Sequence, residues 1–166
     1  MRIHIVCRQN QARSLVASAL LRQHYPNFEI FSSGIQAKTG NPIPPIIHQI
    51  ANRWGLDLLD HFSTNFKDGE TLQESDLVIC ADKAIHSHLA GLNLPGSLLN
   101  VQQWSLADFL LPFDPMGVSP FEIEVELAKM IIATASTVVA HIGFSRSSNI
   151  SALIYTRAKK ILYMNT

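Results

Sequence analysis

Apolar residues in this chain fall into short blocks whose spacing alternates between that of strands and that of helices. An apolar run ending in Val6 leads into Cys7. A polar stretch follows, and then LVASALLRQH, whose apolar positions recur at helical spacing. The pattern predicts a strand that ends at Cys7, a loop, and a helix from Arg13 to about His24, which Pro26 stops.

The same alternation continues along the chain. Strands are predicted at residues 27–33, 76–80 and 97–101, and helices at 44–55, 83–92 and about 120–141. Strands that alternate with helices form βαβ units, in which helices cover both faces of a parallel sheet. We therefore expect a three-layer α/β fold with a four-stranded parallel sheet. Ligands of such sheets bind beyond the carboxyl ends of the strands, where Cys7 lies.

Composition limits the classes of function. The 166 residues suit one domain, 1–166, and their formal net charge is zero, whereas nucleic-acid binders usually carry a basic surplus. No apolar run reaches the roughly 18 residues of a membrane span, and no signal-peptide pattern is present. Cys7 and Cys80 give neither a disulfide framework nor metal-ligand spacing. We expect a cytoplasmic protein with no metal, cofactor, nucleic-acid or membrane partner.

The segment from Cys7 to Ser14 has the chemistry of an anion-binding loop. A loop that feeds a helix N-terminus directs several backbone N–H groups at one point, which favours a phosphate-like anion. Arg13 can bind two oxygens of that anion through its paired donors. The same field favours the nucleophilic thiolate form of Cys7. The alternative is that Cys7 is a small apolar residue at the end of a buried strand.

CRQNQARS resembles the phosphate-binding loop of the low-molecular-weight protein tyrosine phosphatases, Cys-x-Gly-Asn-x-Cys-Arg-Ser. The matching positions are Cys7, Asn10, Arg13 and Ser14. Gln9 replaces a glycine, which changes the backbone freedom of the loop. Ala12 replaces a thiol that in many members traps the oxidised nucleophile as a disulfide. The resemblance continues in order through FSSG, GNPIPP, WGLDLLDHFS, DLVICAD and PFDPMG, from about Arg2 to Ala140.

This resemblance implies hydrolysis of phosphate monoesters, most simply of protein phosphotyrosine or a small aryl phosphate, through a cysteinyl-phosphate intermediate. Cys7 would attack phosphorus, and Asp114 would act as general acid and then as general base. The phosphate-binding residues would be Arg8, Gln9, Asn10, Gln11, Ala12, Arg13 and Ser14. The alternative for Asp114 is ordinary Asp-Pro turn chemistry.

Five residues are candidates to support the loop. Asn10 could hold a left-handed backbone turn, and Ser14 could donate its hydroxyl to the thiolate. Ser32 and His61 match family positions that support the loop from behind through hydrogen bonds. Asp82 could anchor the neighbouring network or only cap its helix. Each has the alternative of an ordinary loop or helix-terminal residue.

Two positions bear on specificity. In the family, the residue after the nucleophile and an aromatic residue after Asp-Pro help to enclose a phosphotyrosine ring, and this chain has Arg8 and Met116 there. Arg8 could stack on the ring or pair with acidic residues that flank a phosphorylated site. Met116 could pack against the ring.

The residues leave two other functions open. One is a thiol-coupled arsenate reductase, a branch that relays oxidation through further cysteines; here only Cys80 remains, so an external thiol would be needed. The other is a catalytically weak anion- or partner-binding protein on the same scaffold. After a break at Gly143, residues 147–164 predict an extra C-terminal helix. That helix would pack on the domain or form a surface for a homodimer or another partner.

Overall fold

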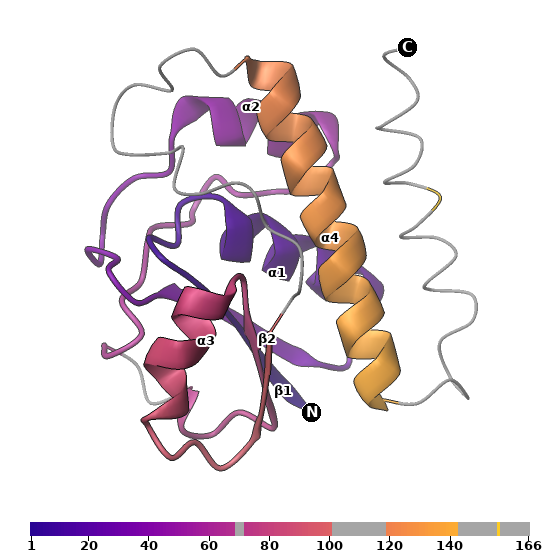
Figure 1. Cartoon of the computed structure of the whole chain (residues 1–166). Helices are drawn as coiled ribbons and strands as arrows, with labels where there is room; N and C mark the ends of the chain where they lie inside the picture. Colours follow the sequence, from indigo (N-terminus) through magenta and orange to yellow (C-terminus); the bar gives the residue numbers. More distant parts are fainter. Residues whose placement is uncertain (69–71, 101–118, 143–155, 157–166) are drawn as a thin grey trace.

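The computed structural model describes residues 1–68, 72–100, 119–142 and 156 (Figure 1). In chain order the elements are β1 (Arg2–Cys7), α1 (Arg13–His24), β2 (Glu29–Gly34), α2 (Pro45–Arg53), β3 (Leu77–Cys80), α3 (Lys83–Ala90), β4 (Ser97–Asn100) and α4 (Pro120–Ile142). Each corresponds to a predicted element whose ends differ by at most about two residues. The predicted helix at 147–164 lies outside the described residues.

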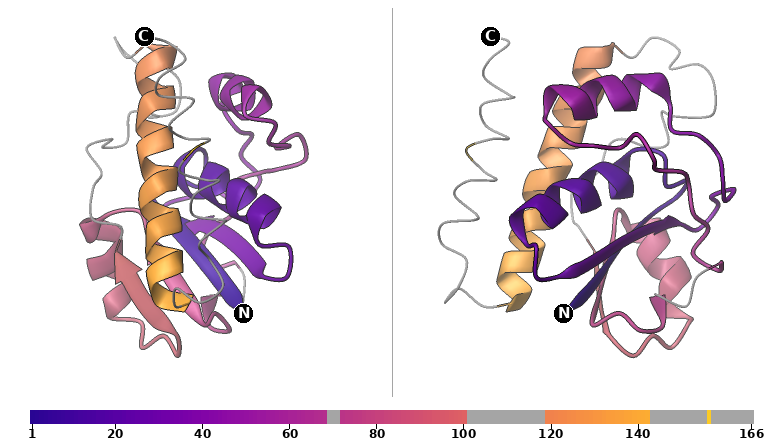
Figure 2. Two further views of the ribbon diagram at one scale, coloured as in Figure 1. Left: turned by 90° about the vertical axis from the view of Figure 1, so that its right-hand side faces the viewer. Right: turned by 180° about the vertical axis from the view of Figure 1, so that it is seen from behind.

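The four strands form one parallel sheet in the order β2-β1-β3-β4, which confirms the expected α/β fold. Alternate residues of a strand point to opposite faces of the sheet. Ile3 and Ile5 of β1 therefore pack in the larger apolar cluster with α1, α2 and α4, whereas Val6 packs in a second cluster with α3. Figure 2 shows α1 and α3 on opposite sides of the sheet. The central strand that ends at Cys7 is thus buried on both faces.

A buried carboxylate links α2 to α4 within the larger core. Glu124, 8% exposed, accepts a hydrogen bond of 2.8 Å from the indole Nε1–H of Trp54. Its other oxygen accepts a bond of 2.6 Å from Nη2 of Arg53, whose side chain is about half exposed. The Trp54 indole N–H donates to Glu124 within the core, whereas the half-exposed Arg53 guanidinium can also be solvated by water.

We expect Glu124→Ala to lower the free energy of unfolding by about 1–3 kcal/mol, because it removes the buried carboxylate that accepts a hydrogen bond from the Trp54 indole N–H. Glu124→Gln keeps an acceptor oxygen and is expected to cost less. Arg53→Ala removes only the solvent-screened ion pair and is expected to cost less than about 1 kcal/mol. Urea unfolding measures all three variants, and equal losses for Glu124→Ala and Arg53→Ala would contradict this account.

Within the described part of the chain, none of the helices combines the length and the apolar character that a membrane crossing requires.

Candidate active site

The loop between β1 and α1 is fixed at its start by the turn that follows β2. Ile35 N–H donates to the carbonyl oxygen of Cys7 at 3.0 Å, and Gln36 N–H donates to that of Arg8 at 2.8 Å. Asn10 then adopts φ 54°, in the left-handed region that asparagine tolerates better than most residues. The chain thereby turns back over the carboxyl end of the sheet and enters α1 at Arg13.

The Cys7 thiol lies among hydrogen-bond donors at the start of α1. Its side chain is buried, and Asn10 N–H donates to Cys7 Sγ at 3.2 Å. The Ser14 hydroxyl lies 3.0 Å from the same sulfur atom. Donors that point at a sulfur atom near a helix N-terminus stabilise a thiolate more than a thiol. The geometry therefore suits a nucleophilic sulfur.

The Asn10 side chain connects the loop to three other segments. Its Nδ2 donates to Ser14 Oγ at 2.9 Å and to Ser32 Oγ at 3.0 Å, and its Oδ1 accepts from Thr64 N–H at 2.9 Å. Because Ser14 Oγ accepts a hydrogen bond from Asn10 Nδ2, its own O–H is left to donate to Cys7 Sγ, or to the Ser33 carbonyl oxygen at 3.4 Å. Asn10 therefore sets the direction of the Ser14 hydroxyl as well as the shape of the loop.

Arg13 and Asp82 form an ion pair beside the loop. Arg13 Nη1 lies 3.0 Å from Asp82 Oδ2, and the arginine side chain is only 8% exposed. The other carboxylate oxygen, Oδ1, accepts the backbone N–H of Ile85 at 2.9 Å and so caps α3. Asp82 thus makes both of the contacts that the sequence offered as alternatives.

Gly34, at the end of β2, allows the loop to lie directly against the sheet. A Cβ atom at this position would be 2.6 Å from the Arg8 carbonyl oxygen and 2.8 Å from the Asn10 nitrogen. Both distances are too short for any side chain, so the loop needs glycine here. Gly34 is the last residue of FSSG and is not among the site residues predicted from the sequence.

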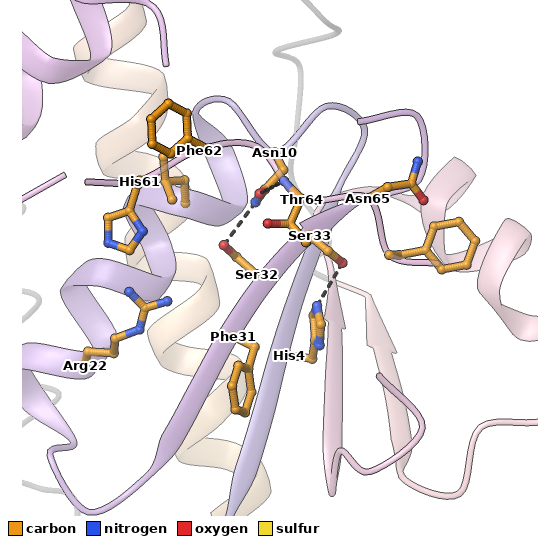
Figure 3. A pocket seen from close by; sticks show the side chains of 12 residues that line it. His4, Asn10, Arg22, Phe31, Ser32, Ser33, His61, Phe62, Thr64 and Asn65 are labelled. Atoms are coloured by element: carbon orange, nitrogen blue, oxygen red, sulfur yellow. Dashed lines mark hydrogen bonds between the residues drawn. The ribbon is translucent and has the colours of Figure 1, made fainter. Parts of the chain in front are cut away.

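The remaining candidates are placed as follows. His61 lies beside Arg22, next to Ser32 (Figure 3). Burial lowers the pKa of His61, with a further contribution from the charge of Arg22. Within the described part of the chain its ring makes no hydrogen bond to the loop. Arg8 Nε donates to Gln36 Oε1 at 2.6 Å. Asp114 and Met116 lie outside the described residues.

Cys80 is the second buried cysteine of the described chain. It lies at the end of β3, is completely buried, and packs in the same apolar cluster as Cys7, on the α3 side of the sheet. Burial first, and then the nearby Asp82 carboxylate, raise the pKa of the Cys80 thiol to about 12. Cys80 is therefore a thiol at neutral pH, which makes it a poor nucleophile. Among the described residues, no cluster of three or more His, Cys, Asp or Glu side chains could hold a metal ion.

Comparison with known sequences identifies the family of proteins that share this fold and this loop. The sequence model of the low molecular weight phosphotyrosine protein phosphatases matches residues 2–101, and the chain belongs to this family. The matched range includes Cys7, Asn10, Arg13, Ser14 and Asp82, and ends before Asp114.

Individual relatives agree with this assignment. The probable low molecular weight protein-tyrosine-phosphatase EpsP of Ralstonia nicotianae is 34% identical over 82 residues, which cover 49% of this chain and 56% of that protein. The chain spans little more than half the length of the curated relatives that it matches.

Two solved structures share the fold. The tyrosine phosphatase Wzb from Escherichia coli K30, in complex with sulphate, gives a TM-score of 0.67 at 21% identity and covers 86% of this chain and 98% of its own. The YwlE arginine phosphatase from Geobacillus stearothermophilus gives a TM-score of 0.65 at 20% identity, over 84% of this chain and 94% of its own.

Proposed function

We propose that this protein hydrolyses phosphate monoesters with Cys7 as the nucleophile. The observation that carries the proposal is the environment of Cys7 Sγ, which receives the Asn10 N–H and faces the Ser14 hydroxyl at the N-terminus of α1. Arg13 enters the same loop with its guanidinium oriented by Asp82. A buried sulfur, a helix N-terminus and an oriented arginine are the elements that transfer of a phosphoryl group to a thiolate requires.

The proposed reaction has two steps. In the first, Cys7 Sγ forms a bond to phosphorus while the bond to the leaving oxygen breaks, and Asp114 gives that oxygen a proton. In the second, Asp114 takes a proton from a water molecule that attacks phosphorus in the cysteinyl-phosphate. The bond from phosphorus to Cys7 Sγ breaks, so inorganic phosphate leaves and Cys7 is again a thiolate. In both steps Arg13 and the loop N–H groups from Arg8 to Ser14 bind the equatorial oxygens, where negative charge gathers.

For the substrate, we infer phosphotyrosine in proteins. The support is family membership and the relative EpsP, which is named as a protein-tyrosine phosphatase. Arg8 and Met116 would contact the ring or acidic residues near the phosphorylated site. The structural neighbour YwlE is named as an arginine phosphatase, so phosphoarginine is the second substrate to assay.

The first test measures the hydrolysis of an aryl phosphate by the wild type and by the variant Asp114→Asn. The assay contains a chelator and covers about pH 5 to 8. The wild type should hydrolyse the ester without added metal. Asp114→Asn should lower kcat about a hundredfold, because asparagine cannot protonate the leaving oxygen. The loss should shrink for aryl leaving groups of lower pKa, which need less protonation. Steady-state rates along a series of substituted aryl phosphates measure this dependence.

Two outcomes would count against the proposal, and a third would count against the role of Asp114. A wild type that shows no turnover with aryl phosphate or phosphoarginine, but reduces arsenate with added thiols, would favour the arsenate reductase alternative. Binding of phosphate without turnover of any of these substrates would favour a binding protein on the phosphatase scaffold. An Asp114→Asn loss that does not depend on the leaving group would remove Asp114 from the role of general acid.

We expect Gly34→Ala to lower kcat/KM by about ten- to a hundredfold, because the added methyl group would displace the loop at Arg8 and Asn10. The matched control is Gly91→Ala after α3, where an added Cβ meets no atom within 4 Å. Activity of the two variants on an aryl phosphate, together with their thermal unfolding, separates a local effect from global destabilisation. Equal activities of the two folded variants would be inconsistent with the close approach at Gly34.

A further inference from the structure

A pocket lies beside the loop that carries Cys7, and Asn10 of this loop is among its lining residues. It has a volume of about 270 Å³, and Cys7 is not among the residues that line it. Arg22 of α1, Ser32 of β2, and His61 and Phe62 from the segment after α2 contribute to its wall, together with Asn10 of the loop. Figure 3 shows the Arg22 guanidinium directed toward His61 and Ser32. The pocket therefore brings a cation, an imidazole and a hydroxyl together.

Arg22 is a half-buried cation without a carboxylate partner in the described part of the chain. Its Nε donates to the Ile30 carbonyl oxygen at 2.8 Å, and its Nη2 donates to Ser18 Oγ at 3.4 Å. Both acceptors are neutral, and they use two of the five N–H groups of the guanidinium. Burial lowers the pKa of Arg22. A buried cation with neutral partners is a favourable place for an anion, because an anion supplies the missing counter-charge.

The surroundings of Arg22 favour a particular kind of anion. Arg22 lowers the pKa of His61 more than the exposed Asp57 or Asp60 raises it, so its positive charge is the largest charge acting on the imidazole. The Ser32 hydroxyl can donate a hydrogen bond, and the ring of Phe62 and the side chain of Leu15 give the pocket apolar walls. A ligand would match these features if it had a planar group that accepts two N–H hydrogen bonds and a small apolar part.

We propose that this pocket binds a small organic carboxylate, with the carboxylate paired to Arg22 and the apolar body against Phe62. The Ser32 hydroxyl would donate a hydrogen bond to the carboxylate, while its oxygen continues to accept a hydrogen bond from Asn10 Nδ2. The bound molecule would thereby strengthen the Ser32–Asn10 contact that holds the catalytic loop. The site does not depend on the proposed phosphatase activity, because it uses none of the atoms of the reaction.

Benzoate is a suitable probe, with benzamide as its uncharged counterpart. We expect benzoate to bind the wild-type chain in the low millimolar range, to shift the NMR signals of the His61 ring, and to raise the pKa of His61 because an anion favours the imidazolium. Benzamide should bind at least about tenfold more weakly. No saturable shift of the His61 signals up to about 100 mM benzoate would overturn the proposal.

Variants locate the binding. Arg13→Gln, which weakens any anion site in the catalytic loop, should leave the benzoate shift of His61 unchanged, whereas Arg22→Gln should weaken binding at least tenfold. Because Arg22 also contacts Ser18 and Ile30, its variant is tested alongside two variants of an exposed residue, Phe62. Phe62 is 57% exposed, so Phe62→Glu and Phe62→Gln should both fold.

The charged Phe62→Glu variant should bind benzoate several-fold more weakly than the neutral Phe62→Gln variant, because like charges repel at the pocket wall. Equal binding by the Phe62→Glu and Phe62→Gln variants would overturn the assignment to this pocket. Loss of binding in Arg13→Gln with retention in Arg22→Gln would instead place the benzoate in the catalytic loop.

Discussion

Replacing Cys7 with serine is expected to reduce hydrolysis of an aryl phosphate by more than about 10⁴-fold. A serine hydroxyl stays protonated at neutral pH and has no base beside it in the loop, where its neighbours, the Asn10 N–H and the Ser14 hydroxyl, are donors. The phosphate-binding groups remain, so inorganic phosphate should still bind to Cys7→Ser. Steady-state kinetics and calorimetric titration with phosphate measure the two properties separately.

Cys80→Ala is the matched control for this experiment. Cys80 is also buried and packs in the same apolar cluster as Cys7, but it lies at the end of β3, where burial raises the pKa of its thiol to about 12. Its loss should lower stability by about 1 kcal/mol and leave kcat within about twofold. If Cys80→Ala were as inactive as Cys7→Ser, a relay between the two cysteines would replace simple hydrolysis by Cys7 as the explanation.

Replacing Arg13 with lysine is expected to lower kcat/KM by about 10³-fold, although the positive charge is kept. An ammonium group cannot offer two parallel N–H donors to the equatorial oxygens, and it gives less stabilisation to the charge that gathers there. The ion pair with Asp82 holds the guanidinium in place at 3.0 Å, and lysine would not preserve this orientation. Activity within about tenfold of the wild type would mean that only the charge matters.

Asp82→Asn gives the matched comparison. Asparagine is also a good N-cap residue, so α3 should keep its start. The variant loses only the negative charge that orients Arg13, and we expect a smaller loss of activity than for Arg13→Lys, about tenfold. A measured loss as large as that of Arg13→Lys would make Asp82 a partner in the reaction rather than a positioning residue.

The sequence predicts the secondary structure of this chain because apolar spacing and helix-breaking residues agree with each other. The helical period stops before Pro26, and α1 ends at His24. The order of the strands in the sheet is not predicted, because the patterns at residues 27–33 and 76–80 each indicate a strand but not which strand it pairs with. Only packing in three dimensions places both of them beside β1.

At the candidate site, residue type and spacing predict which side chains gather, but they do not predict the direction of the hydrogen bonds. Asn10, Ser14 and Ser32 do lie together. Thr64, whose backbone N–H completes the set, belongs to a segment without a motif at that position. The roles of His61, Asp114 and Met116 stay predictions.

The features that sequence analysis missed are contacts between distant positions. Glu124 has the pattern of an ordinary polar helix residue, and its partner Trp54 lies 70 positions away. Arg22 has the pattern of a basic residue in the last turn of a helix, and only the fold places it at a pocket with His61. A local pattern carries no signal for either contact, whereas the glycine in FSSG could have indicated a close approach of two backbones.

The position of β1 in the middle of the sheet has a consequence for the order of folding during synthesis. One side of β1 pairs with β2, but the other pairs with β3, and Arg2 N–H donates to Asp76, 74 positions later. At roughly 5–20 residues per second, a ribosome needs about 4–15 s to make that interval. Through this time the apolar strand that ends in Cys7 has one unpaired edge, and the Cys7 thiol is open to oxidants before the loop closes over it.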